Sequence, residues 1–164
     1  MGTLKKEGEN KMFEPDYRNI VKAAMNQQAV RLPLYEHNVS INKIGEIEGV
    51  DMESLYKGNE NDIHEFFRIY CNFFRIHGYD TVTFEQCIGQ IMPGSGALGD
   101  SRVVPVIQDE DDFKNYPWEE IPELYFKEYS KYFRILREEM PAGMMAAGGP
   151  GNGIFECVQD LTGY

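Results

Sequence analysis

The chain has 164 residues, of which 42% are hydrophobic and 13% aromatic, a composition that excludes a disordered tail. Its formal net charge of −11 argues against binding to nucleic-acid phosphates or anionic membrane surfaces, because both need clustered Lys and Arg. No stretch approaches the roughly 18 apolar residues that a membrane span needs. We therefore expect a cytoplasmic globular protein with no nucleic-acid partner and no membrane partner.

Three cysteines lie far apart in the sequence, at Cys71, Cys87 and Cys157. Their odd number and the lack of a C-x-x-C pair support neither a disulfide framework nor a sequence-local zinc site. This pattern is typical of a reducing compartment. It predicts no metal site and no cofactor held within this chain.

The first half of the chain alternates between helical and strand-like patterns. Residues 1–14 are polar and predict a flexible lead-in, and the apolar spacing after Pro15 predicts a helix that ends near residue 27. The apolar run 31–37 is typical of a buried strand whose C-terminal end opens into a site. The elements expected next are a helix over 41–50 ended by Gly49, a helix over 63–77 ended by Gly78, and a β-branched second strand over 81–84.

The second half begins with a loop. Residues 86–109 are rich in glycine and proline, and the run Val103–Ile107 within them predicts a short hairpin. The elements expected after it are an acidic helix from Asp109, a turn at 118–122, a long helix over 124–140, a third strand over 144–147 and a helix from Ile154. Helices between strands imply parallel strands, which fit either a doubly wound sheet or a (β/α)₈ barrel.

Five short pieces of the chain resemble motifs of the uroporphyrinogen decarboxylase superfamily and occur in the family's order. They are Arg18–Met25 with Val30–Leu34, like the opening helix and D-R-(V/T)-P-V strand; Phe74–Asp80, like R-x-G-(F/Y)-D; Ala97–Gly99; Pro105–Phe113, like P-V-x-x-x-E-D-(L/F); and Gly148–Pro150, like G-(A/G)-P. The resemblance implies an α/β fold. Residues 15–164 would form the N-terminal part of a (β/α)₈ TIM-type barrel with the hairpin inserted after the second strand.

A complete barrel of this kind has about 250 residues, so the resemblance implies that further strands lie outside this sequence. Unpaired strand edges and an uncovered apolar face favour self-association or pairing with a missing C-terminal half. We expect 32–35, 81–84 and 144–147 to be adjacent, parallel strands, and a structure in which they are not would undermine the membership of this superfamily.

The first candidate cluster is Glu36, His37 and Asn38, because barrel sites lie at the C-terminal ends of strands. By resemblance, classical decarboxylases carry an arginine-rich loop there, and no arginine stands between Arg31 and Arg68. Glu36 has the wrong charge for a multiply anionic porphyrinogen. We consider His37 a catalytic candidate and Glu36 and Asn38 substrate-binding candidates. The alternative for His37 is a hydrogen-bonded loop residue.

The second cluster is Glu85 and Gln86, both catalytic candidates. By resemblance, Gln86 stands where the classical decarboxylases have an aspartate that stabilises a protonated intermediate, and an amide does not supply that negative charge. Glu85 is expected on the opposite face of the strand. The alternative is that both side chains end the strand and contact solvent.

The third cluster belongs to the glycine-rich turn Gly148–Gly153 and the helix after it. Gly149, Asn152 and Glu156 are the substrate-binding candidates. The turn could present backbone N–H groups to an anion, or its small residues could let a large planar ligand approach. By resemblance, Glu156 stands where the classical family has a tyrosine.

Three functions remain open. The missing arginine loop and the amide of Gln86 favour the corrinoid-dependent methyltransferase branch, with a tetrapyrrole or corrinoid as ligand. That branch's zinc ligands, a His and two Cys, belong by resemblance to the C-terminal half, so this segment alone should be inactive. The alternatives are a true uroporphyrinogen decarboxylase and a non-catalytic half-barrel binding or assembly module.

Overall fold

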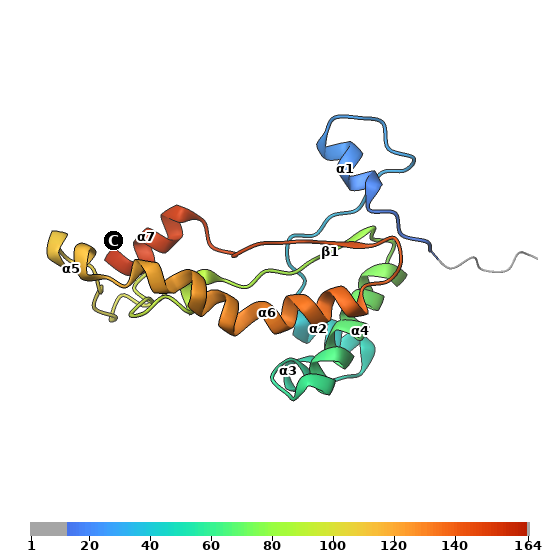
Figure 1. Cartoon of the computed structure of the whole chain (residues 1–164). Helices are drawn as coiled ribbons and strands as arrows, with labels where there is room; N and C mark the ends of the chain where they lie inside the picture. Colours follow the sequence, from blue (N-terminus) through green and yellow to red (C-terminus); the bar gives the residue numbers. More distant parts are fainter. Residues whose placement is uncertain (1–12, 164) are drawn as a thin grey trace, which may run out of the picture. The chain divides into compact units, whose positions relative to one another are not determined.

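The computed structural model describes residues 13–163, which form a mixed α/β structure that is mostly helical (Figure 1). The described chain forms two compact units. Unit 1 comprises residues 13–82 and 139–146, and unit 2 comprises residues 83–138 and 147–163. No helix within the described ranges is both long enough and apolar enough to cross a membrane.

The helices of unit 1 begin and end at residues that suit those positions. They are α1 (Arg18–Ala24), α2 (Ile41–Glu48), α3 (Met52–Tyr56) and α4 (Glu60–Ile76). Gly49 ends α2 in the left-handed conformation, with φ 71°. The Asn59 side chain accepts from the N–H groups of Asn61 and Asp62, and the Asp62 carboxylate accepts from the Asn59 N–H at 2.8 Å. This capping box starts α4.

The core of unit 1 is built on the aromatic face of α4. Phe66 and Phe67 are 1% and 0% exposed, and their rings pack edge to face with centroids 5.0 Å apart. Helices α2 and α3 pack against α4 and bury Ile44 and Met52 in this unit. Full burial of these side chains supplies most of the stabilisation that the short helices lack by themselves.

The described strands form one two-stranded parallel sheet, made of β1 (Thr81–Thr83) and β2 (Met145–Ala147). The Phe84 N–H donates to the Ala147 carbonyl at 3.0 Å, and the Gln86 N–H donates to the Gly149 carbonyl at 3.3 Å. A step of two residues on each side, in the same direction, is the pattern of parallel pairing. The pairing therefore continues beyond the strands into the segments that follow them.

Unit 2 packs its loops against short helices. Its elements are the 3₁₀ turns η1 (Ile88–Gln90) and η2 (Trp118–Glu120) and the helices α5 (Glu110–Asn115), α6 (Ile121–Glu139, of which Glu139 belongs to unit 1) and α7 (Ile154–Thr162). Its buried cluster consists of Met92, Ile107, Tyr116, Ile121 and Leu161. The Ile107 N–H donates to the Leu161 carbonyl at 3.0 Å, which attaches the long loop to α7.

The predicted first strand is wrong. Residues 31–37 contain no strand, and Leu32 remains 87% exposed. A strand needs a partner for its backbone, and Pro33 has no N–H to donate. Just before this segment, the Val30 N–H donates to the Asn19 side chain at 3.2 Å instead of to a strand.

The predicted hairpin is also wrong, because residues 103–107 form turns and irregular backbone. Pro105 has no N–H group, the Val103 N–H closes a turn onto the Asp100 carbonyl at 2.9 Å, and the Ile107 N–H goes to α7. The backbone donors that a hairpin would use are thus directed elsewhere.

The remaining predicted elements are confirmed: the helices near 18–24, 41–48, 60–76, 110–115, 121–139 and 154–162, the strands near 81–83 and 145–147, and the turn at 118–120. The short helix α3 was not predicted. Of the predicted lead-in, residues 1–12 lie outside the described residues. Barrel closure is not shown by a two-stranded sheet. Of the three adjacent, parallel strands expected for a barrel, those near 81–84 and 144–147 pair, whereas 32–35 forms no strand, which weighs against the barrel interpretation.

Candidate functional site

Parallel pairing brings several predicted site residues together in unit 2. We name Gln86, Cys87, Gly149, Asn152 and Glu156 the strand-end cluster. The Gln86 N–H donates to the Gly149 carbonyl at 3.3 Å, and the Gly89 N–H donates to Asn152 Oδ1 at 3.4 Å. Gln86, Gly149, Asn152 and Glu156 were predicted as site residues from the sequence, and Cys87 is the fifth member of the cluster.

Glycines make this close approach possible. A Cβ at Gly148 would lie 1.9 Å from the Phe84 carbonyl oxygen, and one at Gly151 would lie 2.6 Å from Cys87 Sγ. Gly151 also has φ +77°, a conformation that residues with a Cβ rarely adopt. The glycine-rich turn is therefore needed to lay residues 148–151 against residues 84–87.

The N-terminus of α7 is capped by its own side chain. Glu156 Oε2 accepts from the Gly153 N–H at 2.5 Å, and the Asn152 N–H donates to the Pro150 carbonyl at 3.1 Å. A carboxylate of the chain thus occupies the position where an external anion would bind. This arrangement favours a packing role for the glycine-rich turn over the predicted anion contact.

The two catalytic candidates after β1 lie on opposite faces of the extended chain. Phe84 packs edge to face against Phe133 of α6, with ring centroids 5.6 Å apart. Gln86 shares that face because side chains alternate, and it is 7% exposed. Glu85 lies on the other face and is half-buried. The carboxylate of Glu85 therefore points to the face opposite to that of Phe84 and Gln86.

The electrostatics of the strand-end cluster disfavour a reactive thiol. Burial raises the pKa of Cys87, and the charges of Glu85 and Glu156 raise it further. Burial also raises the pKa of Cys157, with Asp160 and Glu156 adding to the effect. Both thiols stay protonated near neutral pH, so neither is a prepared nucleophile.

The predicted residues Glu36, His37 and Asn38 form an exposed loop of unit 1. The Tyr35 hydroxyl lies 3.4 Å from His37 Nδ1, a long hydrogen bond. These three residues belong to unit 1, whereas the strand-end cluster belongs to unit 2. The loop agrees with the alternative proposed for His37, a hydrogen-bonded loop histidine.

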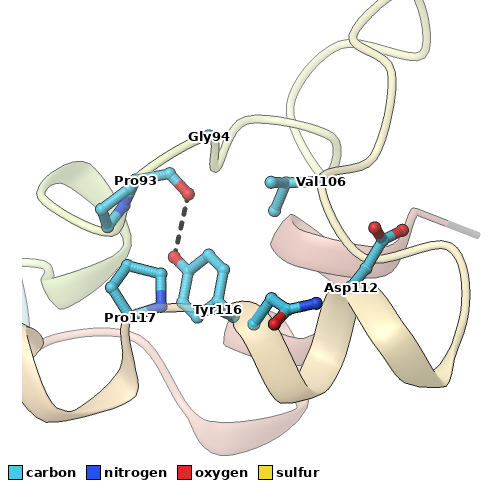
Figure 2. A pocket seen from close by; sticks show the side chains of 7 residues that line it. Pro93, Gly94, Val106, Asp112, Tyr116 and Pro117 are labelled. Carbon is cyan, nitrogen blue, oxygen red and sulfur yellow. Dashed lines mark hydrogen bonds between the residues drawn. The ribbon is translucent and has the colours of Figure 1, made fainter.

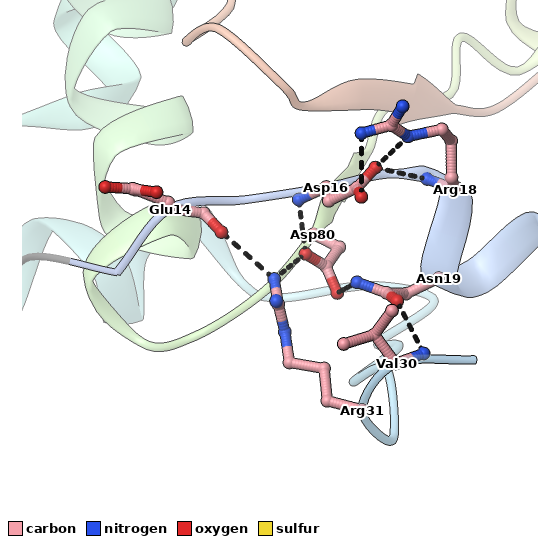
Figure 3. Close-up of polar contacts among 7 residues, drawn as sticks. All are labelled: Glu14, Asp16, Arg18, Asn19, Val30, Arg31 and Asp80. Carbon is pink, nitrogen blue, oxygen red and sulfur yellow. Dashed lines mark hydrogen bonds and ion pairs between the residues drawn. The ribbon is translucent and has the colours of Figure 1, made fainter.

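A buried carboxylate in unit 1 was not among the predicted site residues (Figure 3). Asp80 is 0% exposed, and its Oδ1 accepts from the Asp16 N–H at 2.6 Å and forms an ion pair with Arg31 Nη2. Its Oδ2 accepts from Asn19 Nδ2 at 3.3 Å. Arg31 Nη2 also donates to the Glu14 carbonyl at 3.1 Å. Asp80 therefore joins the start of α1, the segment before it and residue 31.

This network was hard to predict because Arg31 and Asp80 are 49 residues apart. Only an indirect indication of it was present in the sequence. Arg31 and Asp80 belong to two of the segments that resemble motifs of the uroporphyrinogen decarboxylase superfamily, Val30–Leu34 and Phe74–Asp80. Asp80 connects these segments of unit 1 through contacts with the chain's own backbone and side chains.

Within the described ranges, no group of three or more His, Cys, Asp and Glu side chains is arranged to hold a metal ion. Comparison of the chain with family models, curated proteins and solved structures finds no match.

Proposed function

We propose that this chain is the N-terminal part of a uroporphyrinogen decarboxylase-like (β/α)₈ barrel enzyme of the corrinoid-dependent methyltransferase branch. The observation that carries the proposal is the parallel pairing of β1 and β2, with a predicted site cluster where both strands end. Barrel enzymes place their sites at these C-terminal strand ends. Helix α6 connects the two strands in sequence, as a barrel crossover does.

The Asp80 network gives a second, independent support. Two segments that resemble family motifs, Val30–Leu34 and Phe74–Asp80, are joined by the ion pair of Arg31 with buried Asp80. A chance resemblance gives no reason for residues of two motifs to meet in space. The pair would position the start of the barrel even though residues 31–37 form no strand here.

The charge of the strand-end cluster favours methyl transfer over porphyrinogen decarboxylation. The five residues of the cluster include the carboxylate of Glu156 and no Arg or Lys. Glu85, a second carboxylate, immediately precedes Gln86 in the sequence. Polycarboxylate substrates are recognised by cationic side chains, Arg above all. The amide of Gln86 does not supply the charge that stabilises a cationic pyrrole intermediate. We assign Glu85 to substrate contact, and we assign no metal ligand to the described residues.

Completion of the barrel would require strands from the chain beyond residue 164 or from a second copy. Large apolar side chains in both units agree with such a partner: Val30 83%, Leu32 87%, Ile154 87% and Phe155 72% exposed. Surfaces of this kind are typical of interaction sites.

The test uses the full-length protein in two assays, one with methylcobalamin and a thiol and one with uroporphyrinogen. We expect methylation of the thiol and no loss of carboxyl groups from uroporphyrinogen. Glu85→Gln should lower methyl transfer by roughly tenfold, whereas Glu128→Gln, on the exposed side of α6, should leave it unchanged. Decarboxylation would support the alternative enzyme. Absence of turnover in both assays, without tetrapyrrole binding, would leave a non-catalytic module.

A further inference from the structure

Unit 2 contains a pocket of about 300 Å³ outside the strand-end cluster (Figure 2). Its apolar walls come from Pro93, Gly94, Val106, Tyr116 and Pro117. The Tyr116 hydroxyl donates to the Pro93 carbonyl at 2.9 Å and joins the two sides of the pocket. Because the hydroxyl is engaged and Tyr116 is only 7% exposed, the tyrosine is a fixed wall.

One carboxylate faces the pocket in Figure 2, that of Asp112. It is half-buried, and its Oδ2 accepts from the Gln108 N–H at 3.0 Å. Among the described contacts, Oδ1 has no hydrogen-bond donor. The lysine two residues further along α5, Lys114, forms an ion pair with Glu110 at 2.8 Å. The charge of Asp112 is therefore not neutralised by the basic residue of its own helix.

An aromatic group stands behind the tyrosine wall. The rings of Tyr116 and Trp118 have centroids 4.6 Å apart, and Phe113 packs on Trp118 at 5.1 Å. Aromatic rings attract organic cations through their negative faces. Of these three rings, Tyr116 lines the pocket. A carboxylate, the Tyr116 ring and apolar walls together suit a ligand with a short hydrocarbon part and a positive charge.

We propose that this pocket binds an alkylammonium group. The hydrocarbon part packs on Val106 and Pro117, and the ammonium pairs with Asp112. A ligand carboxylate or phosphate would meet Asp112 with the same sign of charge. The inference does not depend on the proposed function, since no residue of the strand-end cluster lines the pocket.

The test exploits Trp118, the single tryptophan of the chain. Because its ring packs on Tyr116, its fluorescence should respond when the pocket fills. We expect a saturable change with butylammonium, with a dissociation constant on the order of 1 mM, and none with butyrate at equal ionic strength. An equal response to butyrate would overturn the proposal.

Two neighbouring substitutions separate the pocket from general charge effects. Asp112→Asn should weaken butylammonium binding roughly fivefold, while its amide oxygen still accepts from the Gln108 N–H. Asp111→Asn removes the same charge from an exposed position that does not line the pocket, and it should leave the affinity unchanged. Equal affinities for the two variants would also overturn the proposal.

A third variant and a second probe complete the design. Val106→Phe should fill the pocket and abolish the response, with an unchanged near-ultraviolet circular dichroism spectrum as the check on folding; binding retained by the folded variant would contradict the assignment. Nα-acetyl-lysine amide carries the same group on a peptide-like scaffold. Tighter binding of this probe than of butylammonium would assign the pocket to a lysine of a partner protein, and the reverse to a small amine.

Discussion

At the scale of single residues, Gly148 and Asp80 each allow a contact between segments that are far apart in the sequence. Gly148 lets the turn after β2 lie directly on the carbonyl of Phe84. Asp80 holds the segment before α1 through its bonds to Asp16 and Arg31. In both places a contact between distant parts of the sequence depends on one side chain, or on the absence of one.

Gly148→Ala should therefore destabilise the protein. Its Cβ would lie 1.9 Å from the Phe84 oxygen, so the pairing beyond β1 and β2 must open, at a cost of about 3 kcal/mol in the free energy of unfolding. Gly149→Ala is the matched control, because a Cβ there meets nothing within 4 Å. Urea unfolding measures both, and equal midpoints for the two variants would contradict the close approach.

Asp80→Ala should lower the free energy of unfolding by a similar amount. It leaves the partly buried guanidinium of Arg31 without its counter-charge, which we expect to cost about 3 kcal/mol. Asp100→Ala removes a surface partner of Arg102, and it should leave the unfolding midpoint unchanged. If thermal or urea unfolding showed no difference between the two variants, the Asp80 network would not stabilise unit 1.

At the scale of elements, local signals were reliable and pairing signals were not. The end of α4 was predicted from Gly78 and the start of α7 at Ile154, because a helix closes its hydrogen bonds within itself and its signals are local. Helix α4 begins at Glu60, three residues before the predicted start. A strand depends on a partner that its own sequence does not identify. The run 31–37 is apolar enough for a strand, yet it forms none.

The same distinction explains the site. Gln86 and Gly149 were expected at strand ends, and the parallel pairing brings them into contact. The bond between Arg31 and Asp80 joins residues 49 positions apart, and the Asp112 pocket combines two loops with a helix. The periodicity of apolar residues carries no information about contacts between distant segments. Neither the Arg31–Asp80 ion pair nor the Asp112 pocket could therefore be predicted from the sequence alone.

The capping box of α4 gives a test at this scale. Asn59→Ala removes the acceptor for two N–H groups at the helix start and should lower the free energy of unfolding by about 1 kcal/mol. Asn61→Ala, two residues into the exposed first turn, keeps that acceptor and should have little effect. Urea unfolding followed by circular dichroism at 222 nm compares the two, and a larger loss for Asn61→Ala would show that the cap is not the stabilising feature.

At the scale of the whole molecule, the proposed barrel requires the parallel sheet to be part of a larger one. A two-stranded sheet is marginal by itself, and eight strands close a barrel. Exposed apolar residues occur in unit 1, at Val30 and Leu32, and in unit 2, at Ile154 and Phe155. An acidic chain with a net charge of −11 should otherwise repel its own copies. Self-association would therefore indicate specific apolar contacts.

The most direct test of the partial barrel is the mass of the 164-residue chain in solution, measured by light scattering during size-exclusion chromatography. The chain has a mass of 18.9 kDa. We predict species at multiples of that mass, or a stable complex with a separately produced C-terminal part of the same protein. A monodisperse, cooperatively folded monomer that does not bind the C-terminal part would contradict the barrel proposal.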